Sequence, residues 1–242
     1  MSNNKLTVEN WVKILRDVLD IVSPILVFGP TGTSKSTACM KAAVETGRPV
    51  YKIQCTPDTD RSAIIGSMGI RDGNTIHLDG PAVLAMRAGG VLVLEEIDRL
   101  ERAADSDVQA VMDDLLNMQI IDTHGQPVKP KEGFRVLATT NANNPLDSMS
   151  AAVADRFRVV IPALFPCEEA MATLEERERT LVASHYKHSA KNWSWSAGLS
   201  FRRVLAFQKL KSSVGEETAA VLTFGNGANE FLSQLASASN NS

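Results

Sequence analysis

Short apolar segments recur along the first two thirds of this 242-residue chain. Five of them stand out, at 25–28, 50–55, 91–94, 134–140 and 158–162. Continuous apolar runs of this length are typical of strands that are buried on both faces of a parallel sheet. Helical periodicity appears between them, for example at Val108, Val111, Met112 and Leu115. The alternation predicts an α/β domain, a three-layer core around a parallel five-stranded sheet.

Two segments depart from this alternation. Residues 56–80 are rich in Gly, Asp and Thr and form an excursion from the domain. In residues 119–133 the pair His124-Gly125 lies between short extended pieces, which predicts a β-hairpin. At the start, apolar residues at helical spacing predict an amphipathic helix over 5–21, ended by Pro24.

From about Phe165 onward the pattern is helical, and no strand pattern follows. This change predicts a separate all-helical subdomain. The chain ends in a polar stretch, Ala-Ser-Ala-Ser-Asn-Asn-Ser, for which we expect disorder. The expected organisation is a core over 1–164, a small helical lid over 165–235 and a disordered tail over 236–242.

Composition and charge restrict the function only slightly. With 44% apolar and 22% charged residues the chain is typical of water-soluble globular proteins. A net charge of −3 gives no strong attraction to DNA or to anionic membranes. Cys39, Cys55 and Cys167 are widely spaced and odd in number, which favours reduced thiols in the cytoplasm. No apolar run approaches the roughly 20 residues needed to cross a bilayer, so we expect no membrane partner.

The turn after the first strand is close to a phosphate-binding loop, G-x-x-x-x-G-K-[ST]. It consists of Gly29, Pro30, Thr31, Gly32, Thr33, Ser34, Lys35, Ser36 and Thr37. Such a loop binds phosphate through backbone N–H groups at a helix N-terminus. Lys35 would reach the β- and γ-phosphates, and Ser36 would ligate Mg²⁺. Ser34 replaces the last glycine, at a modest expected cost; the alternative is a glycine turn that binds nothing.

Polar residues follow two of the predicted strands. Glu95 and Glu96 come directly after 91–94, where adjacent acids are costly unless they serve a cation or water. In a phosphate-loop enzyme the first acid holds the Mg²⁺ shell and the second polarises the attacking water. The first is usually Asp, so Glu95 is one methylene longer. Asn141 follows the next strand, where its amide can orient that water; a solvated helix start and a common Asn-Asn-Pro turn are the simpler interpretations.

Five motifs now stand in order: GPTGTSKST, DGPAVLAMRAGGVLVLEEIDR, ATTNANNP, AAVADRF and LSFRRVL. Together they resemble the AAA+ ATPases of the MoxR-like clade, which includes the CbbQ and NorQ types and belongs to the dynein-related subfamily. The resemblance covers roughly residues 20–212. It implies a P-loop NTPase fold in which the helical segment is a lid over the nucleotide-binding core.

The resemblance also implies an assembly. Members of this clade form rings, usually hexamers, with ATP between subunits. Arg156 resembles the arginine finger that reaches the neighbouring subunit's nucleotide, with Arg158 as the local rival. Arg202 resembles the sensor 2 arginine, with Arg203 beside it. Surface salt bridges are the alternative for each. The segments 56–80 and 119–133 would be inserts that face the partner or the pore.

The function implied is an ATP-binding and ATP-hydrolysing ring protein that remodels or activates a client protein, often one with a von Willebrand A domain. Two alternatives stay open. A nucleic-acid motor or helicase loader would need basic residues lining the ring, for which Lys129 and Lys131 are too few. A non-hydrolysing switch, in which ATP only holds the ring together, is suggested by Ser34 and Glu95.

Overall fold

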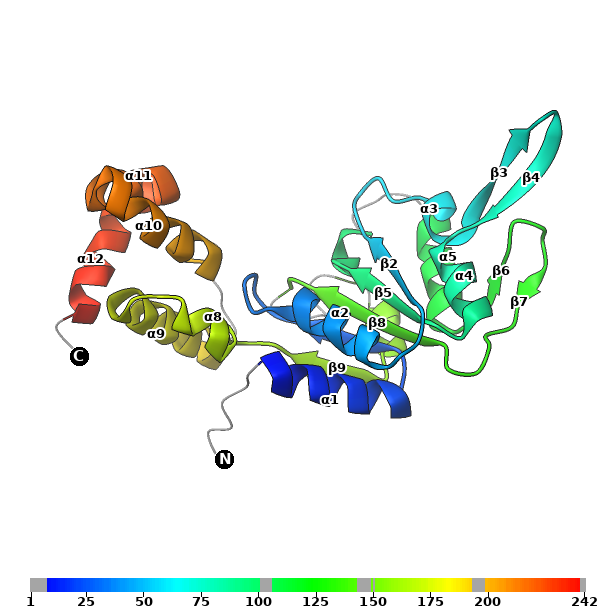
Figure 1. The fold of residues 1–242 in the computed structure, drawn as a ribbon, viewed down its shortest axis with the longest axis horizontal. Helices are drawn as coiled ribbons and strands as arrows, with labels where there is room; N and C mark the ends of the chain where they lie inside the picture. The colour runs from blue at the N-terminus through cyan, green and yellow to red at the C-terminus, as the bar shows by residue number, and fades with distance from the viewer. Residues whose placement is uncertain (1–7, 101–105, 143–148, 150, 193–198, 240–242) are drawn as a thin grey trace. The chain divides into compact units, whose positions relative to one another are not determined.

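The computed structural model describes residues 8–100, 106–142, 149, 151–192 and 199–239. The chain divides into two compact units, whose helices and strands are labelled in Figure 1. The sheet unit comprises Glu9–Phe28 and Lys35–Pro162. The helical unit comprises the chain from Ala163 onward together with Gly29–Ser34. Residues 29–34 fall within the predicted core range of 1–164, whereas their contacts group them with the C-terminal helices.

A parallel five-stranded sheet forms the centre of the sheet unit, as predicted. Its strand order is β2-β5-β8-β1-β9, and every neighbouring pair is parallel. The strands are β1 (Ile25–Phe28), β2 (Val50–Gln54), β5 (Val91–Glu95), β8 (Arg135–Thr140) and β9 (Val159–Pro162). All four residues of β1 and all five of β5 are buried, which explains their unbroken apolar character.

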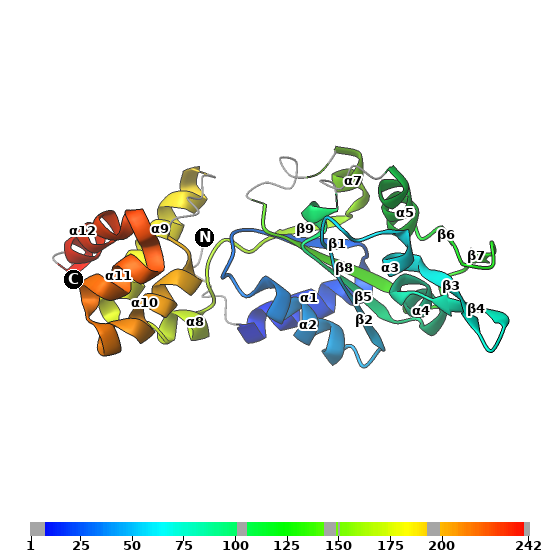
Figure 2. The same cartoon turned by 90° about the horizontal axis from the view of Figure 1, so that it is seen from above.

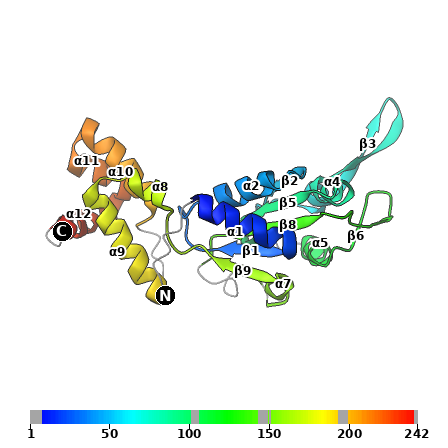
Figure 3. The same cartoon turned by 60° about the horizontal axis from the view of Figure 1, so that its bottom comes forward.

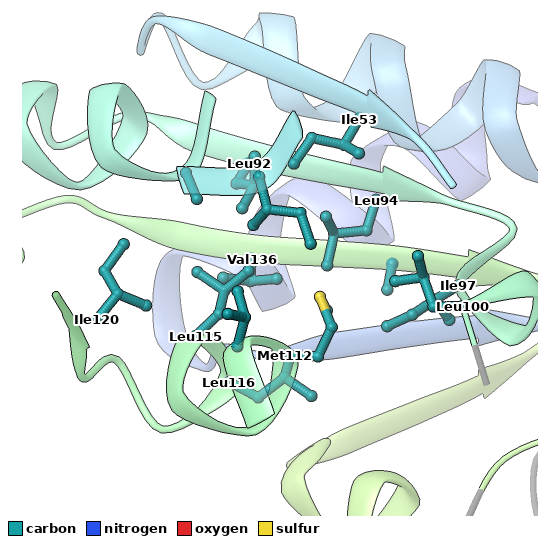
Figure 4. Close-up of a cluster of buried hydrophobic side chains, with 14 of the residues drawn as sticks. Ile53, Leu92, Leu94, Ile97, Leu100, Met112, Leu115, Leu116, Ile120 and Val136 are labelled. Carbon is teal, nitrogen blue, oxygen red and sulfur yellow. The ribbon is translucent and has the colours of Figure 1, made fainter. Parts of the chain in front are cut away.

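Helices cover both faces of this sheet. Figures 2 and 3 show α1 and α2 on one face and α5 and α7 on the other. Side chains from β2, β5, β8 and α5 form one buried cluster, in which Ile53, Leu94 and Leu115 are labelled in Figure 4. The helices are α1 (Val8–Ile21), α2 (Lys35–Glu45), α3 (Arg61–Ile65), α4 (Pro81–Ala88), η1 (Ile97–Arg99), α5 (Ser106–Leu116) and α7 (Ala151–Arg156).

Two hairpins occupy the segments that interrupt the alternation. Strands β3 (Gly66–Arg71) and β4 (Asn74–Asp79) are antiparallel, and with α3 they make up most of the 56–80 excursion. Strands β6 (Ile120–Ile121) and β7 (Pro127–Val128) form the second hairpin, so the predicted turn at His124-Gly125 is confirmed. Gly125 has a φ of 75°, a left-handed conformation that favours glycine.

The described part of the helical unit has its own apolar core, which includes Val182, Phe207 and Leu235. Its helices are α8 (Glu168–Ala172), α9 (Glu176–Asn192), α10 (Phe201–Val214), α11 (Glu216–Phe224), η2 (Gly225–Gly227) and α12 (Ala228–Ser239). Residues 236–239 continue α12 and do not form the expected disordered tail, because buried Leu235 anchors the preceding turn and Ala238 packs against the core. Across the described residues, no helix combines the length and apolar character that a bilayer span requires.

Candidate functional site

The carboxyl ends of β5 and β8 meet at one edge of the sheet, since the two strands are parallel neighbours. Glu95 is the last residue of β5, and Glu96 follows it. Asn141 follows β8 and donates a hydrogen bond from Nδ2 to Glu96 Oε1 at 2.8 Å. The structure therefore brings together the second acid and the amide that the sequence placed after neighbouring strands.

Several groups fix Glu96 in place. Its other carboxylate oxygen, Oε2, lies 2.7 Å from Arg99 Nε and 3.3 Å from Gln54 Nε2. Its backbone is left-handed, with φ 56° and ψ 49°, and its N–H donates to Thr139 Oγ1 at 3.3 Å. A residue with a side chain pays about 1–2 kcal/mol for this conformation. Strain of this kind persists only where the surroundings impose it, so the position of Glu96 is strongly constrained.

Glu95 points to the side of the sheet that α2 covers. Burial raises the pKa of the Cys39 thiol on α2 to about 12, while the charge of Lys35 lowers this pKa and that of Glu95 raises it. Lys35 and Glu95 are thus both close enough to act on one buried thiol. The residue Glu95 is 7% exposed, and its Oε2 lies 2.7 Å from Lys52 Nζ on β2. A buried carboxylate needs such a counter-ion.

A third acid at this edge, Asp98, was not singled out from the sequence. It is 9% exposed and accepts a hydrogen bond from Thr140 Oγ1 at 2.7 Å. Burial, and after it the charges of Asp98, Glu96 and Glu95, raise the pKa of Cys55 to about 12. Negative charge is therefore concentrated where β2 and β5 end. The signal available in the sequence was a third acid, three residues after Glu95 and between Ile97 and Arg99.

Lys35 and Ser36 begin α2, and the Lys35 residue is only 6% exposed. The Ser36 hydroxyl and the Glu95 carboxylate are hard oxygen donors of the kind Mg²⁺ takes. Within the described ranges, no group of three or more His, Cys, Asp or Glu residues could enclose a metal ion. This donor set fits Mg²⁺, which is usually held by one or two protein oxygens and otherwise by water and phosphate.

The loop Gly29–Ser34 leaves no room for a side chain at its first residue. A Cβ on Gly29 would lie 2.3 Å from the carbonyl oxygen of Ala163. The Tyr186 hydroxyl donates to the Thr31 carbonyl at 2.9 Å, and Ser34 Oγ lies 3.3 Å from Cys167 Sγ. Ser34 has a φ of 62°, in the left-handed region where the usual motif has glycine. The serine thus adopts the backbone conformation of the residue that it replaces.

The candidate arginines lie in three places. Arg156 ends α7 and forms a two-point ion pair with Asp113 of α5, with N···O distances of 2.9 and 3.0 Å. The hydrogen bond to Asp113 and then its charge raise the pKa of Arg156. The rival Arg158 donates its backbone N–H to the Pro24 carbonyl. Arg202 and Arg203 are exposed in the first turn of α10, in the helical unit.

A parallel sheet in this order, with a phosphate-loop motif after β1 and two acids at the end of β5, defines a P-loop NTPase fold of the AAA+ type. The chain belongs to the AAA domain family (dynein-related subfamily), whose model matches residues 24–157. The predicted resemblance to MoxR-like AAA+ ATPases is confirmed by this match and by a NorQ relative.

That relative is protein NorQ of Paracoccus denitrificans, 29% identical over 136 residues, which cover 55% of this chain and 50% of NorQ. An uncharacterized protein of Staphylococcus aureus (strain bovine RF122 / ET3-1) is 28% identical over 165 residues, 65% of this chain and 61% of its own length. The chain thus spans about half to three fifths of the length of these curated relatives.

Solved structures of NtrX from Brucella abortus share the fold. One has a TM-score of 0.52 at 16% identity and covers 91% of this chain and 52% of NtrX. Another, of NtrX in complex with ATP, has a TM-score of 0.50 at 14% identity and covers 98% of this chain and 69% of that one.

Proposed function

We propose that this chain binds Mg·ATP and hydrolyses it as a subunit of a hexameric ring. The observation that carries the proposal is the arrangement at one sheet edge: Glu96 held by Asn141, beside a buried Glu95 on the same side as Lys35. Membership of the AAA domain family supports the same conclusion.

Each residue of the site has a proposed task. The phosphates are surrounded by the loop backbone and by the first turn of α2, which includes Thr37. The loop residues are Gly29, Pro30, Thr31, Gly32, Thr33 and Ser34. Lys35 pairs with the charge of the phosphates. Ser36 and Glu95 would hold Mg²⁺, which when bound neutralises charge on the phosphates. Glu96 polarises the attacking water, and Asn141 orients it. A carboxylate has about four lone-pair sites, so Glu96 keeps room for a water beside its present partners.

The arginines belong to the assembly in this proposal. Arg156 acts as the finger that completes a neighbour's site, and its ion pair with Asp113 restricts its side chain before assembly. Arg202 acts as the sensor 2 arginine of the helical lid. Arg158 and Arg203 are the respective alternatives, and exchanging each for Ala alone would separate them.

We further propose a protein client, for example one with a von Willebrand A domain, in the cytoplasm. The β3–β4 hairpin supports a protein contact, since Met68 is 66% and Ile70 is 83% exposed. The net charge of −3 gives less support to a nucleic-acid motor. A non-hydrolysing switch is the stronger alternative, because Ser34 is left-handed and Glu95 is already paired with Lys52.

Phosphate release by the wild-type chain and by Glu96→Gln tests hydrolysis. We expect Glu96→Gln to bind ATP and to lose at least about a hundredfold in rate, the usual worth of a positioned general base. Glu217→Gln, an exposed change on α11, is the matched control. Equal and negligible rates in the wild type and Glu96→Gln would favour the switch, and stimulation by DNA would favour the motor.

Lys35→Ala tests the nucleotide site itself. Loss of the buried ammonium should abolish ATP binding while the fold persists, because α2 has other buried residues to hold it. Binding is measured by equilibrium titration, with Lys41→Ala on the exposed side of α2 as control. Unchanged affinity of Lys35→Ala for ATP would contradict the site assignment.

A further inference from the structure

The ammonium of Lys52 lies against the acid that the proposed function assigns to the metal. We propose that Lys52 is an internal counter-ion that competes with the divalent cation for Glu95 and so sets the metal concentration that the site requires. This inference rests on the proposed function, specifically on Glu95 as a metal ligand. It makes Lys52 a residue that tunes the site without touching the nucleotide.

Strand register explains why Lys52 reaches Glu95. In the β2–β5 pair, Gln54 is the partner of Glu95 and Lys52 is the partner of Val93. Side chains alternate along a strand, so Lys52 and Gln54 share a face, and Ile53 points the other way into the core. Lys52 therefore projects on the same face as Glu95, two residues before the end of its strand.

In this ion pair the Glu95 side chain is buried and the Lys52 side chain is partly exposed. Lys52 Nζ lies 2.7 Å from Glu95 Oε2, the length of a charge-assisted hydrogen bond. The Glu95 side chain is 9% exposed, whereas that of Lys52 is 44% exposed. The buried carboxylate needs a cation in either state. The lysine has a flexible stem and solvent around it, so it can withdraw when a metal ion takes its place.

Competition follows from charge and from shared atoms. A metal ion and an ammonium group repel one another, and both seek the same carboxylate oxygens. The free energy by which Lys52 stabilises metal-free Glu95 is therefore lost from the free energy of metal binding. A chain with Lys52 needs more free metal for half-saturation than one without it.

The length of the Glu95 side chain also contributes to its ion pair with Lys52. Aspartate is one methylene shorter, which shortens its reach by about 1.5 Å. From the same backbone position, an aspartate carboxylate would lie farther from Lys52 Nζ, so the ion pair would be weaker unless the lysine moved inward. The glutamate at this position and the lysine on β2 thus act as a pair.

Manganese binding measures the effect without turnover. Mn²⁺ is titrated into the full chain with saturating ADP, and free Mn²⁺ is followed by electron paramagnetic resonance. Lys52→Met, which is one atom shorter and removes the charge, should lower the Mn²⁺ concentration for half-saturation by about fivefold. This factor corresponds to about 1 kcal/mol, the upper contribution of a partly exposed ion pair. Lys52→Arg keeps the charge and pairs in two-point fashion, so half-saturation should rise. A folding defect would not move the two variants in opposite directions.

Two further variants complete the test. Lys41→Met, a lysine exposed on α2, should change Mn²⁺ binding by less than about twofold. In a Glu95→Asp background, Lys52→Met should have a smaller effect, because the pair is already weakened. Unchanged or weaker Mn²⁺ binding by Lys52→Met, with ADP still bound, would overturn the competition and leave the nucleotide site standing. Failure of the wild type to bind ADP would overturn both.

Discussion

Ser34 is the one departure from the phosphate-loop motif. Its φ of 62° is left-handed, a conformation that glycine adopts more easily than serine. A side chain in this region costs about 1–2 kcal/mol, whereas glycine enters it freely. We expect Ser34→Gly to raise the free energy of unfolding by about 1 kcal/mol, part of the gain being offset by the greater freedom of glycine in the unfolded chain. Urea unfolding measures this change in the free energy of unfolding. Ser34→Ala, which loses the hydroxyl but keeps the strain, is the control, and a less stable Ser34→Gly would contradict this account.

Cys39 and Cys55 lie beside the charges of the candidate site, but burial dominates their chemistry. Because the pKa of each thiol is raised to about 12, almost no thiolate is present near neutral pH. In a Cys167→Ser background we therefore expect neither thiol to react with a disulfide reagent until the chain unfolds. The colour yield in native buffer and in guanidinium measures this. Rapid reaction in native buffer would show that α2 or the end of β2 opens locally.

At the scale of elements, Arg87 connects the two hairpins. From the end of α4 its guanidinium contacts Asp79 of β4 and, at 2.5 Å, Asp122 beside the β6–β7 turn. Asp122 also accepts the backbone N–H groups of His124 and Gln126, so it holds the turn. We expect Arg87→Met to speed amide hydrogen exchange in residues 120–128 by about fivefold or more, with global stability nearly unchanged, since Arg87 is partly exposed. Arg71→Met, near the tip of the other hairpin, is the control; equal exchange in both variants would contradict the bridge.

The elements also show how far the sequence could predict this molecule. The strands were predictable because strands such as β1 and β5 are buried throughout and so have unbroken apolar sequences. The second hairpin was predictable because the pair His124-Gly125 favours a tight turn between two antiparallel strands. The pairings Lys52–Glu95, Asp98–Thr140 and Arg156–Asp113 were not, because each depends on the register or approach of segments far apart in the chain. Alternating Ala and Ser residues at the end of α12 carry no strong helical pattern, so their packing had to come from the structure.

At the scale of the whole molecule, each unit has its own core. Breaking an ion pair in the helical unit tests whether the two units unfold independently. In the helical unit, Lys211 Nζ lies 2.6 Å from Glu178 Oε1 and 2.8 Å from Glu175 Oε2, and Glu178 is fully buried. Lys211→Met would leave a buried charge without its cation, which costs about 3 kcal/mol. Hydrogen exchange should then rise throughout α9 and α10 and stay unchanged in β5 and β8.

A second change shows whether the cost comes from the unpaired charge. Adding Glu178→Leu to Lys211→Met removes the buried carboxylate and should restore most of the lost protection. Lys209→Met, which changes a neighbouring lysine on α10, is the control. Loss of protection in both units after Lys211→Met would mean that they unfold as one.

The hydrogen bond from Tyr186 to the Thr31 carbonyl gives this chain a natural spectroscopic probe. The sequence contains 2 tyrosines, and the other, Tyr51, is on β2. Chain made with fluorotyrosine therefore has one fluorine resonance that senses the backbone of the loop and one that serves as an internal reference. Occupancy of the loop can be followed through a single fluorine atom, with no dye attached and no change to the encoded sequence.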